Sequence, residues 1–275
     1  MNRLFSTSFW LFATLALSAC GGNGGASSSA ANNSGAANSS AVSLTLNDTG
    51  TTFCRDSAGD NADCLVAPAQ DGNNGRDSQT LAKQGAGPAG FDWSKLAQDG
   101  SLLANQKLAW QNTGSESANT QWSCVQDHHT GLRWEVKSNV MGSLNHRDLR
   151  YSWINSDANT NGGMAGTAST DDCNGSLCDT QAYVAALNTV NFCGHNNWRL
   201  PSLNELLSLV VTDNLDLVMD ANYFPNAHND QYWTYQSYAP DNNRAWYLYF
   251  SDGSFGITLK SSPNYLRLVS DSNND

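Results

Sequence analysis

Residues 193–206 read Cys193-Gly194-His195-Asn196-Asn197-Trp198-Arg199-Leu200-Pro201-Ser202-Leu203-Asn204-Glu205-Leu206. Ser202 and Glu205 have the spacing of a capping box, in which each side chain bonds the backbone N–H of the other residue. The pattern predicts a helix that begins after Ser202, with a buried stripe at Leu203, Leu206, Leu207 and Val210. We expect Trp198 to fill the core at the start of this helix. Arg199 is expected to be a structural donor to carbonyl or carboxylate groups.

A second helix is predicted just upstream. Thr180 is a suitable N-cap for a helix that runs to about Asn188. Gly194 stands where the end of a helix favours a left-handed residue. The helix would bury one face, formed by Tyr183, Val184 and Leu187.

Strands are predicted on both sides of the helices. Residues 132–137 alternate apolar and charged side chains, which predicts a half-buried strand with Arg133, Glu135 and Lys137 facing outward. The C-terminal part has strand-like runs at 232–235, 245–250, 255–259 and 265–269, with a hairpin turn at Asp252-Gly253. Residues 91–96 are predicted to form a helical turn that buries Phe91 and Leu96. Two helices between groups of strands predict an α+β domain with many loops.

Three blocks of the sequence carry a family resemblance. They are residues 124–137, residues 193–206, and the aromatic run from Tyr232 to Gly253. In order and spacing, over about residues 119–270, they resemble the Lcl C-terminal domain of bacterial surface proteins. The resemblance implies a C-type-lectin-like fold, related also to the formylglycine-generating enzyme, and proteins that are often lipoproteins of unassigned activity. The chain departs from the family in lacking a collagen repeat and in having Leu268 where related domains often have a cysteine.

The N-terminus predicts the location of the protein. Arg3 precedes an apolar run at 9–17, and Leu17-Ser18-Ala19-Cys20 resembles the lipobox of bacterial lipoproteins. We therefore expect a signal peptide at 1–19, a lipidated Cys20 followed by a flexible tether to residue 42, an extension packed on the main domain at 43–118, and an Lcl-like domain at 119–275. Because Gly21 rather than Asp follows Cys20, we expect the acyl chains, palmitate among them, to anchor the protein in the outer membrane of the cell envelope.

Charge excludes several kinds of partner. The chain has 14 Lys and Arg against 25 Asp and Glu, a formal charge of −11, and no basic run. Such a protein repels nucleic acid at long range. Sulfated polyanions are unsuitable partners for the same reason.

Six cysteines remain once Cys20 is acylated: Cys54, Cys64, Cys124, Cys173, Cys178 and Cys193. An even number in an oxidising compartment favours disulfides, although six cysteines allow many pairings. Proximity suggests Cys54–Cys64 and Cys173–Cys178, which leaves Cys124–Cys193. A zinc site at Cys173, Cys178 and Cys193 is disfavoured, because the spacing of zinc ligands and a histidine cluster are both missing.

A calcium loop is suggested by residues 157–162. Asp157, Asn159, Asn161 and Gly162 reproduce its opening pattern, and the three side chains are candidate Ca²⁺ ligands. The closing glutamate would fall at Ala168. We therefore favour a surface loop over a calcium site and expect no cofactor.

Aromatic residues in the C-terminal strands are candidate ligand contacts. Alternation sends about half of them into the core, and we expect Trp233 and Trp246 among these. The tyrosines on the opposite face then become the candidates for stacking on a glycan: Tyr232, Tyr235, Tyr247 and Tyr249.

No catalytic signature is present. The five histidines are scattered at positions 128, 129, 146, 195 and 228, and the motifs of serine hydrolases, zinc proteases and phosphate loops are missing. The sequence therefore favours a non-enzymatic binding or adhesion module, with a carbohydrate or matrix protein as ligand. Two alternatives stay open: an enzyme or maturation factor of the formylglycine-generating type, and a purely structural envelope lipoprotein.

Overall fold

The structure is a computed structural model. It describes residues 47–51, 53–56, 59–62, 64, 69–76, 79, 81–168, 178–212 and 218–271. The chain divides into two units, residues 1–42 and 43–275. The predicted signal peptide, Cys20 and the tether lie outside the described residues, so the structural description below concerns the second unit. Neither helix in the described residues has the length and apolar character that a membrane span requires.

The elements alternate short strands with two helices and many loops. In chain order they are β1 (Cys54–Asp56), β2 (Gly59–Ala62), η2 (Asp71–Asn73), β3 (Trp93–Leu96), β4 (Cys124–Asp127), β5 (Leu132–Glu135), α1 (Thr180–Thr189), η3 (Phe192–Gly194), α2 (Leu203–Leu207), β6 (Gln231–Ser237), β7 (Arg244–Tyr249), β8 (Phe255–Leu259) and β9 (Val269–Asp271). The prediction of a mixed α+β domain stabilised by disulfides is confirmed.

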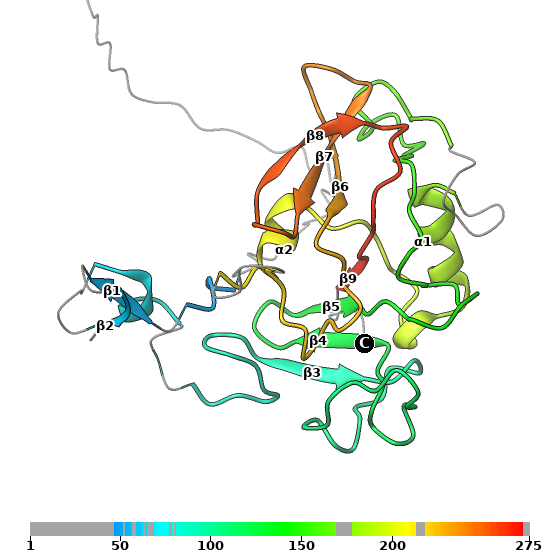
Figure 1. The fold of residues 1–275 in the computed structure, drawn as a ribbon. Helices are drawn as coiled ribbons and strands as arrows, with labels where there is room; N and C mark the ends of the chain where they lie inside the picture. The colour runs from blue at the N-terminus through cyan, green and yellow to red at the C-terminus, as the bar shows by residue number, and fades with distance from the viewer. Residues whose placement is uncertain are drawn as a thin grey trace, which may run out of the picture. The chain divides into compact units, whose positions relative to one another are not determined.

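Antiparallel sheets form the framework of the domain. One has the strand order β3-β4-β5-β9 and another has the order β6-β7-β8, while β1 and β2 form a separate hairpin. In Figure 1 the two larger sheets lie one above the other, and α1 stands at their side. Trp134 pairs with Val125 on one side and with Val269 on the other. The last strand of the chain therefore closes the sheet that begins near residue 93.

The segment 91–96 is a strand, and the predicted helical turn is wrong. Phe91 and Leu96 are buried as expected, but residues 93–96 pair with β4. The outer edge of β3 is covered by Gln106, whose side-chain amide accepts from Lys95 N at 2.6 Å and donates to Lys95 O at 2.9 Å. Main-chain groups cover the rest of this edge, since Ala86 and Trp93 exchange two hydrogen bonds and Leu103 N donates to Lys95 O at 3.1 Å.

Both helices form where the sequence places them. The capping box of α2 is confirmed: Glu205 N donates to Ser202 Oγ at 3.1 Å, and Ser202 N donates to the Glu205 carboxylate at 2.6 Å. For α1 the predicted cap is wrong by one residue, because Asp179 accepts from Ala182 N. Asn191 is the first left-handed residue beyond α1, and Gly194 (φ 76°) closes the η3 turn instead.

Two hydrophobic clusters cover opposite faces of the sheets. Trp134, Tyr232 and Leu248 belong to one cluster, while Trp233 and Ala245 belong to the other. Successive residues of a strand point to opposite faces, so both faces of the three-stranded sheet are covered. Trp198 is buried as predicted, and its indole nitrogen donates to Phe192 O at 2.8 Å.

Glu135 and Lys137 do not face outward as alternation predicts, but lie in the interior with side-chain exposures of 0% and 4%. Their face of β5 meets α1, where Tyr183 donates to Glu135 Oε1. Lys137 Nζ lies 2.7 Å from the same carboxylate oxygen, and Leu268 N donates to the other oxygen at 3.0 Å. Burial is the main cause that lowers the pKa of Lys137, and Glu135 opposes it. Arg267, fully buried, donates to the Glu135 carbonyl.

The described disulfides join Cys54 to Cys64 and Cys124 to Cys193, as proximity suggested. The first closes the β1–β2 hairpin, and the second ties β4 to the turn after α1 across 69 residues of sequence. Cys178 is disulfide-bonded as well. Cys173 lies outside the described residues.

Replacing Glu135 by alanine is expected to cost about 3–5 kcal/mol of unfolding free energy, because it leaves the Lys137 ammonium buried without its carboxylate. Urea denaturation followed by fluorescence measures the loss. The double variant Glu135→Leu, Lys137→Met should be more stable than Glu135→Ala alone. As a control, Asp241→Ala breaks the exposed pair with Arg244 and should leave the midpoint nearly unchanged. Equal midpoints for Glu135→Ala and the control would contradict the role of the carboxylate.

The two described disulfides should differ in their contribution. Loop-closure entropy predicts a loss of about 4 kcal/mol for the Cys124→Ala, Cys193→Ala pair and about 3 kcal/mol for Cys54→Ala, Cys64→Ala. The first pair should also weaken the near-ultraviolet circular dichroism of the buried tryptophans, because Cys124 and Cys193 lie in the core. A larger loss of stability for the hairpin pair would refute this ranking.

Candidate functional site

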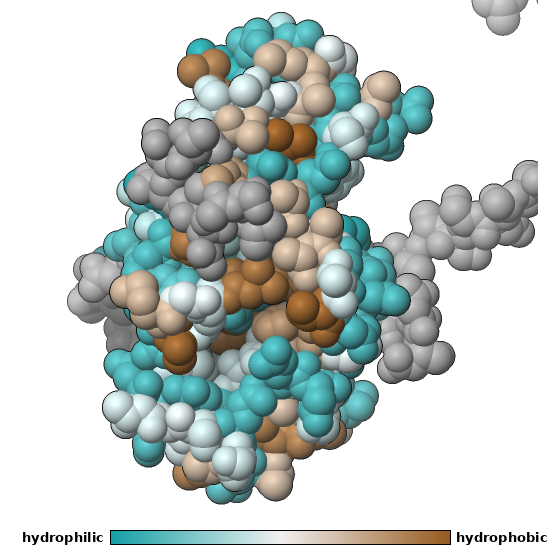
Figure 2. Space-filling model, turned by 90° about the vertical axis from the view of Figure 1, so that its right-hand side faces the viewer, coloured by the Kyte–Doolittle hydropathy of each residue, from teal (hydrophilic) through white to brown (hydrophobic). Residues whose placement is uncertain are grey.

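A cleft of about 600 Å³ lies beside α1. Four segments that are far apart in the sequence line it: the strip at 153–155, the first turns of α1, the residues leading into α2, and β6. The lining residues are Trp153, Ile154, Asn155, Thr180, Gln181, Val184, Arg199, Leu200, Ser202, Glu205 and Tyr235. On the side of the molecule that carries α1, Figure 2 shows hydrophobic residues gathered around a hollow near the middle of the face.

The wall formed by α1 is held to Ile154 and Ser156 by side-chain hydrogen bonds. Thr180 Oγ1 accepts from Ile154 N at 2.9 Å and donates to Ile154 O at 2.8 Å. Gln181 Oε1 accepts from Ser156 N at 2.8 Å. Residues 180, 181 and 184 fall on neighbouring positions of the helix surface, so the same helix face carries these bonds and lines the cleft.

The opposite wall contains an ion-pair network centred on Arg199. Its Nη1 donates to Glu205 Oε2 at 2.9 Å, and its Nη2 donates to Glu205 Oε1 at 2.8 Å and to Asp271 Oδ1 at 2.9 Å. Burial alone would lower the pKa of Arg199, but the hydrogen bonds to Glu205 and Asp271 outweigh it and raise the pKa above its ordinary value. The predicted role of Arg199 as a structural donor is confirmed.

The four candidate tyrosines do not form one surface. Tyr235 is 45% exposed and lines the cleft. Tyr232 is 1% exposed, and its hydroxyl accepts from His228 N, so its prediction as a ligand contact is wrong. Tyr247 and Tyr249 are half-buried and do not line the cleft. The reason is that β6 and β7 are covered on both faces, which alternation alone does not reveal.

The two tryptophans named with these tyrosines also differ from each other. Trp233 is fully buried as predicted, and its indole nitrogen donates to Tyr151 O at 2.8 Å. Trp246 is only half-buried and packs edge-on against Tyr238.

The oxygens of Asp157 and Asn161 in the suggested calcium loop accept hydrogen bonds within the protein. Asp157 Oδ1 accepts from Asn159 N at 3.0 Å, and its other oxygen accepts from Thr160 Oγ1 at 3.1 Å. These bonds lower the pKa of Asp157. Asn161 O accepts from the ammonium of Lys260 at 2.8 Å. Among the described residues no cluster of His, Cys, Asp and Glu has the geometry of a metal site.

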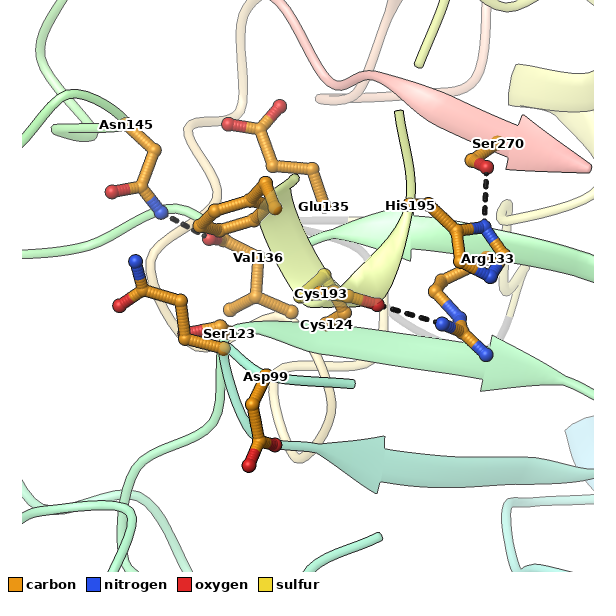
Figure 3. The surroundings of a disulfide bond; sticks show 12 residues. Asp99, Ser123, Cys124, Arg133, Glu135, Val136, Asn145, Cys193, His195 and Ser270 are labelled. Atoms are coloured by element: carbon orange, nitrogen blue, oxygen red, sulfur yellow. Dashed lines mark hydrogen bonds between the residues drawn. A yellow bond between two sulfur atoms is a disulfide. The ribbon is translucent and has the colours of Figure 1, made fainter. Parts of the chain in front are cut away.

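The turn after α1 is positioned by contacts around the Cys124–Cys193 disulfide (Figure 3). Arg133 Nη1 donates to the Cys193 carbonyl at 2.7 Å, and His195 Nδ1 lies 2.7 Å from Ser270 Oγ. Both Cys193 and His195 are buried. These contacts therefore fix the position of a loop within the core. The cysteines of the described residues are disulfide-bonded, so none of these five is a thiol nucleophile: Cys54, Cys64, Cys124, Cys178 and Cys193.

Sequence reasoning missed most of the cleft. Gln181, Ile154 and Leu200 carry no motif, and they come together only because α1 packs against the strip at 153–156. Two signals pointed to cleft residues: strand alternation named Tyr235, and the capping box placed Ser202 and Glu205 at the start of α2.

Comparison with known proteins identifies the family. No curated protein and no solved structure matches the chain. The model of the Lcl C-terminal domain matches residues 123–270, which is more than half of the sequence and includes α1, α2 and every cleft residue named above. The chain therefore belongs to the Lcl C-terminal domain family.

Proposed function

We propose that the protein is a lipid-anchored lipoprotein of the bacterial envelope whose Lcl C-terminal domain binds a ligand without transforming it. The cleft beside α1 carries this proposal. Its volume of about 600 Å³ and its lining, which combines apolar side chains with polar groups, are typical of small-ligand sites. A carbohydrate or an exposed part of a matrix protein would fit a site of this kind.

The cleft favours binding over chemistry because its charged groups and the Thr180 hydroxyl bond to other groups of the protein. Glu205 is 3% exposed, and its carboxylate bonds Arg199 and the backbone of Ser202. Thr180 bonds Ile154 through both its donor and its acceptor. A general base must be within reach of a proton on the substrate, and these groups are held by protein partners instead.

The anchoring half of the proposal rests on the leader sequence. The apolar run at 9–17 and the tetrapeptide ending in Cys20 have the order of a lipoprotein signal. Two or more acyl chains on Cys20 would hold the protein stably at a membrane. The residues after Cys20 are rich in Gly, Ser and Asn, a composition typical of a flexible tether between membrane and domain.

Cys20→Ala is expected to abolish incorporation of labelled palmitate and to move the protein from the membrane fraction to the soluble fraction. The reason is that the substitution removes the acceptor thiol. Ser29→Ala, in the predicted tether, is the control and should keep both the label and the membrane location. Retention of the label by Cys20→Ala would rule out lipidation at this residue.

Tyr235→Ala is expected to weaken binding at least about tenfold, because it removes the exposed ring at the cleft. Arrays of glycans, matrix proteins and cell-wall fragments identify a ligand, and titration calorimetry then compares the variants. Tyr249→Ala is the matched control, since this tyrosine lies outside the cleft. Its affinity should stay within about twofold of wild type. A wild-type protein that binds nothing on these arrays would be incompatible with the proposed function.

A further inference from the structure

The cleft contains one cation among its lining residues, and that cation is already neutralised. Arg199 donates two hydrogen bonds to Glu205, one to Asp271 and one, at 3.4 Å, to Leu200 O. These contacts use most of the five N–H groups of a guanidinium. Both Glu205 oxygens are engaged in turn, one of them also by Ser202 N. Arg199 is therefore not a free anion receptor.

The charge balance of this wall opposes an anionic ligand. One guanidinium faces two carboxylates, Glu205 and Asp271, so the network carries a net negative charge. The Asp271 side chain is 48% exposed. A carboxylate or sulfate that entered the cleft would lose water and meet this negative charge without gaining a free donor pair.

The groups that remain available are uncharged. Tyr235 is an exposed residue, and so is Gln181, whose Oε1 accepts from Ser156 N. Within the described residues, no protein group accepts from Gln181 Nε2 or from the Tyr235 hydroxyl. Ile154, Val184 and Leu200 supply apolar parts of the lining. A sugar matches this set, because it offers a C–H face to an aromatic ring and hydroxyl oxygens to an amide donor.

We infer that the cleft selects an uncharged sugar unit. Tyr235 stacks on the sugar ring, and Gln181 Nε2 donates to a hydroxyl oxygen. Asp271 and Glu205 occupy the donors of Arg199, so Arg199 does not bind acidic sugars. The inference rests on the proposed binding function and adds the class of ligand. Gln181 and Tyr235 are binding residues in this scheme. Asp271 is a positioning residue, since it acts through Arg199 and does not line the cleft.

The test measures the ratio of affinities for neutral and acidic sugars. The full mature chain in detergent micelles is titrated with cellobiose and N,N′-diacetylchitobiose, and separately with a uronic-acid disaccharide and a sulfated disaccharide. Wild type should prefer a neutral disaccharide. Asp271→Asn removes one negative charge from the network around Arg199 and should lower the neutral-to-acidic affinity ratio about tenfold. Gln181→Ala should weaken neutral-sugar binding about tenfold and leave the fold unchanged by circular dichroism.

Asp241→Asn is the matched control, because Asp241 also pairs with an arginine, Arg244, but lies outside the cleft. It should leave the ratio unchanged. A wild-type preference for acidic sugars, or an unchanged ratio for Asp271→Asn, would overturn the inference. Tyr235-dependent binding of a peptide or matrix protein without sugar binding would overturn the inference and leave the proposed function in place. If no probe binds in a Tyr235-dependent way, both fail.

Discussion

The carboxylate of Glu135 is the contact on which the rest of the domain depends. From the middle of the four-stranded sheet it accepts from Tyr183 of α1, lies 2.7 Å from the Lys137 ammonium, and accepts from Leu268 N just before β9. A buried charge is tolerated only where such partners compensate its lost hydration. The helix, the sheet and the C-terminal segment must therefore assemble together around it, which fixes their mutual register.

The cleft follows from this constraint. Because the inner face of α1 is bound to Glu135 through Tyr183, the neighbouring face with Gln181 and Val184 is left to line the cleft. The same segment that supplies Leu268 also supplies Asp271, whose carboxylate holds Arg199 on the opposite wall. Core and candidate site thus share the helix and the last strand.

Local pattern predicted both helices and several strands, but it missed β3 and did not show which faces of the elements are buried. Ser202 and Glu205 were sufficient to predict the start of α2, since a capping box depends on two residues that are three positions apart. Alternation placed β5 correctly yet sent Glu135 and Lys137 outward, and it left Tyr232 as a ligand candidate. In each case the face of the strand that was expected to be exposed is covered by a segment distant in the sequence. The cleft was beyond prediction for the same reason, since its residues belong to four separate stretches that meet only after folding.

A buried lysine contacts the loop that resembles a calcium site. Lys260 lies 99 residues from Asn161, yet its ammonium occupies the carbonyl oxygens of Asn161 and Met164 and lies 4.2 Å from the centre of the Trp153 ring. The loop that resembles a calcium site is therefore stabilised by a lysine of the chain itself. Among the described residues, four buried bases (Lys95, Lys137, Lys260 and Arg267) are matched by four buried acids (Asp92, Asp127, Glu135 and Glu205). The excess of −11 consequently lies outside the buried set, which strengthens the case that the ligand is not a polyanion.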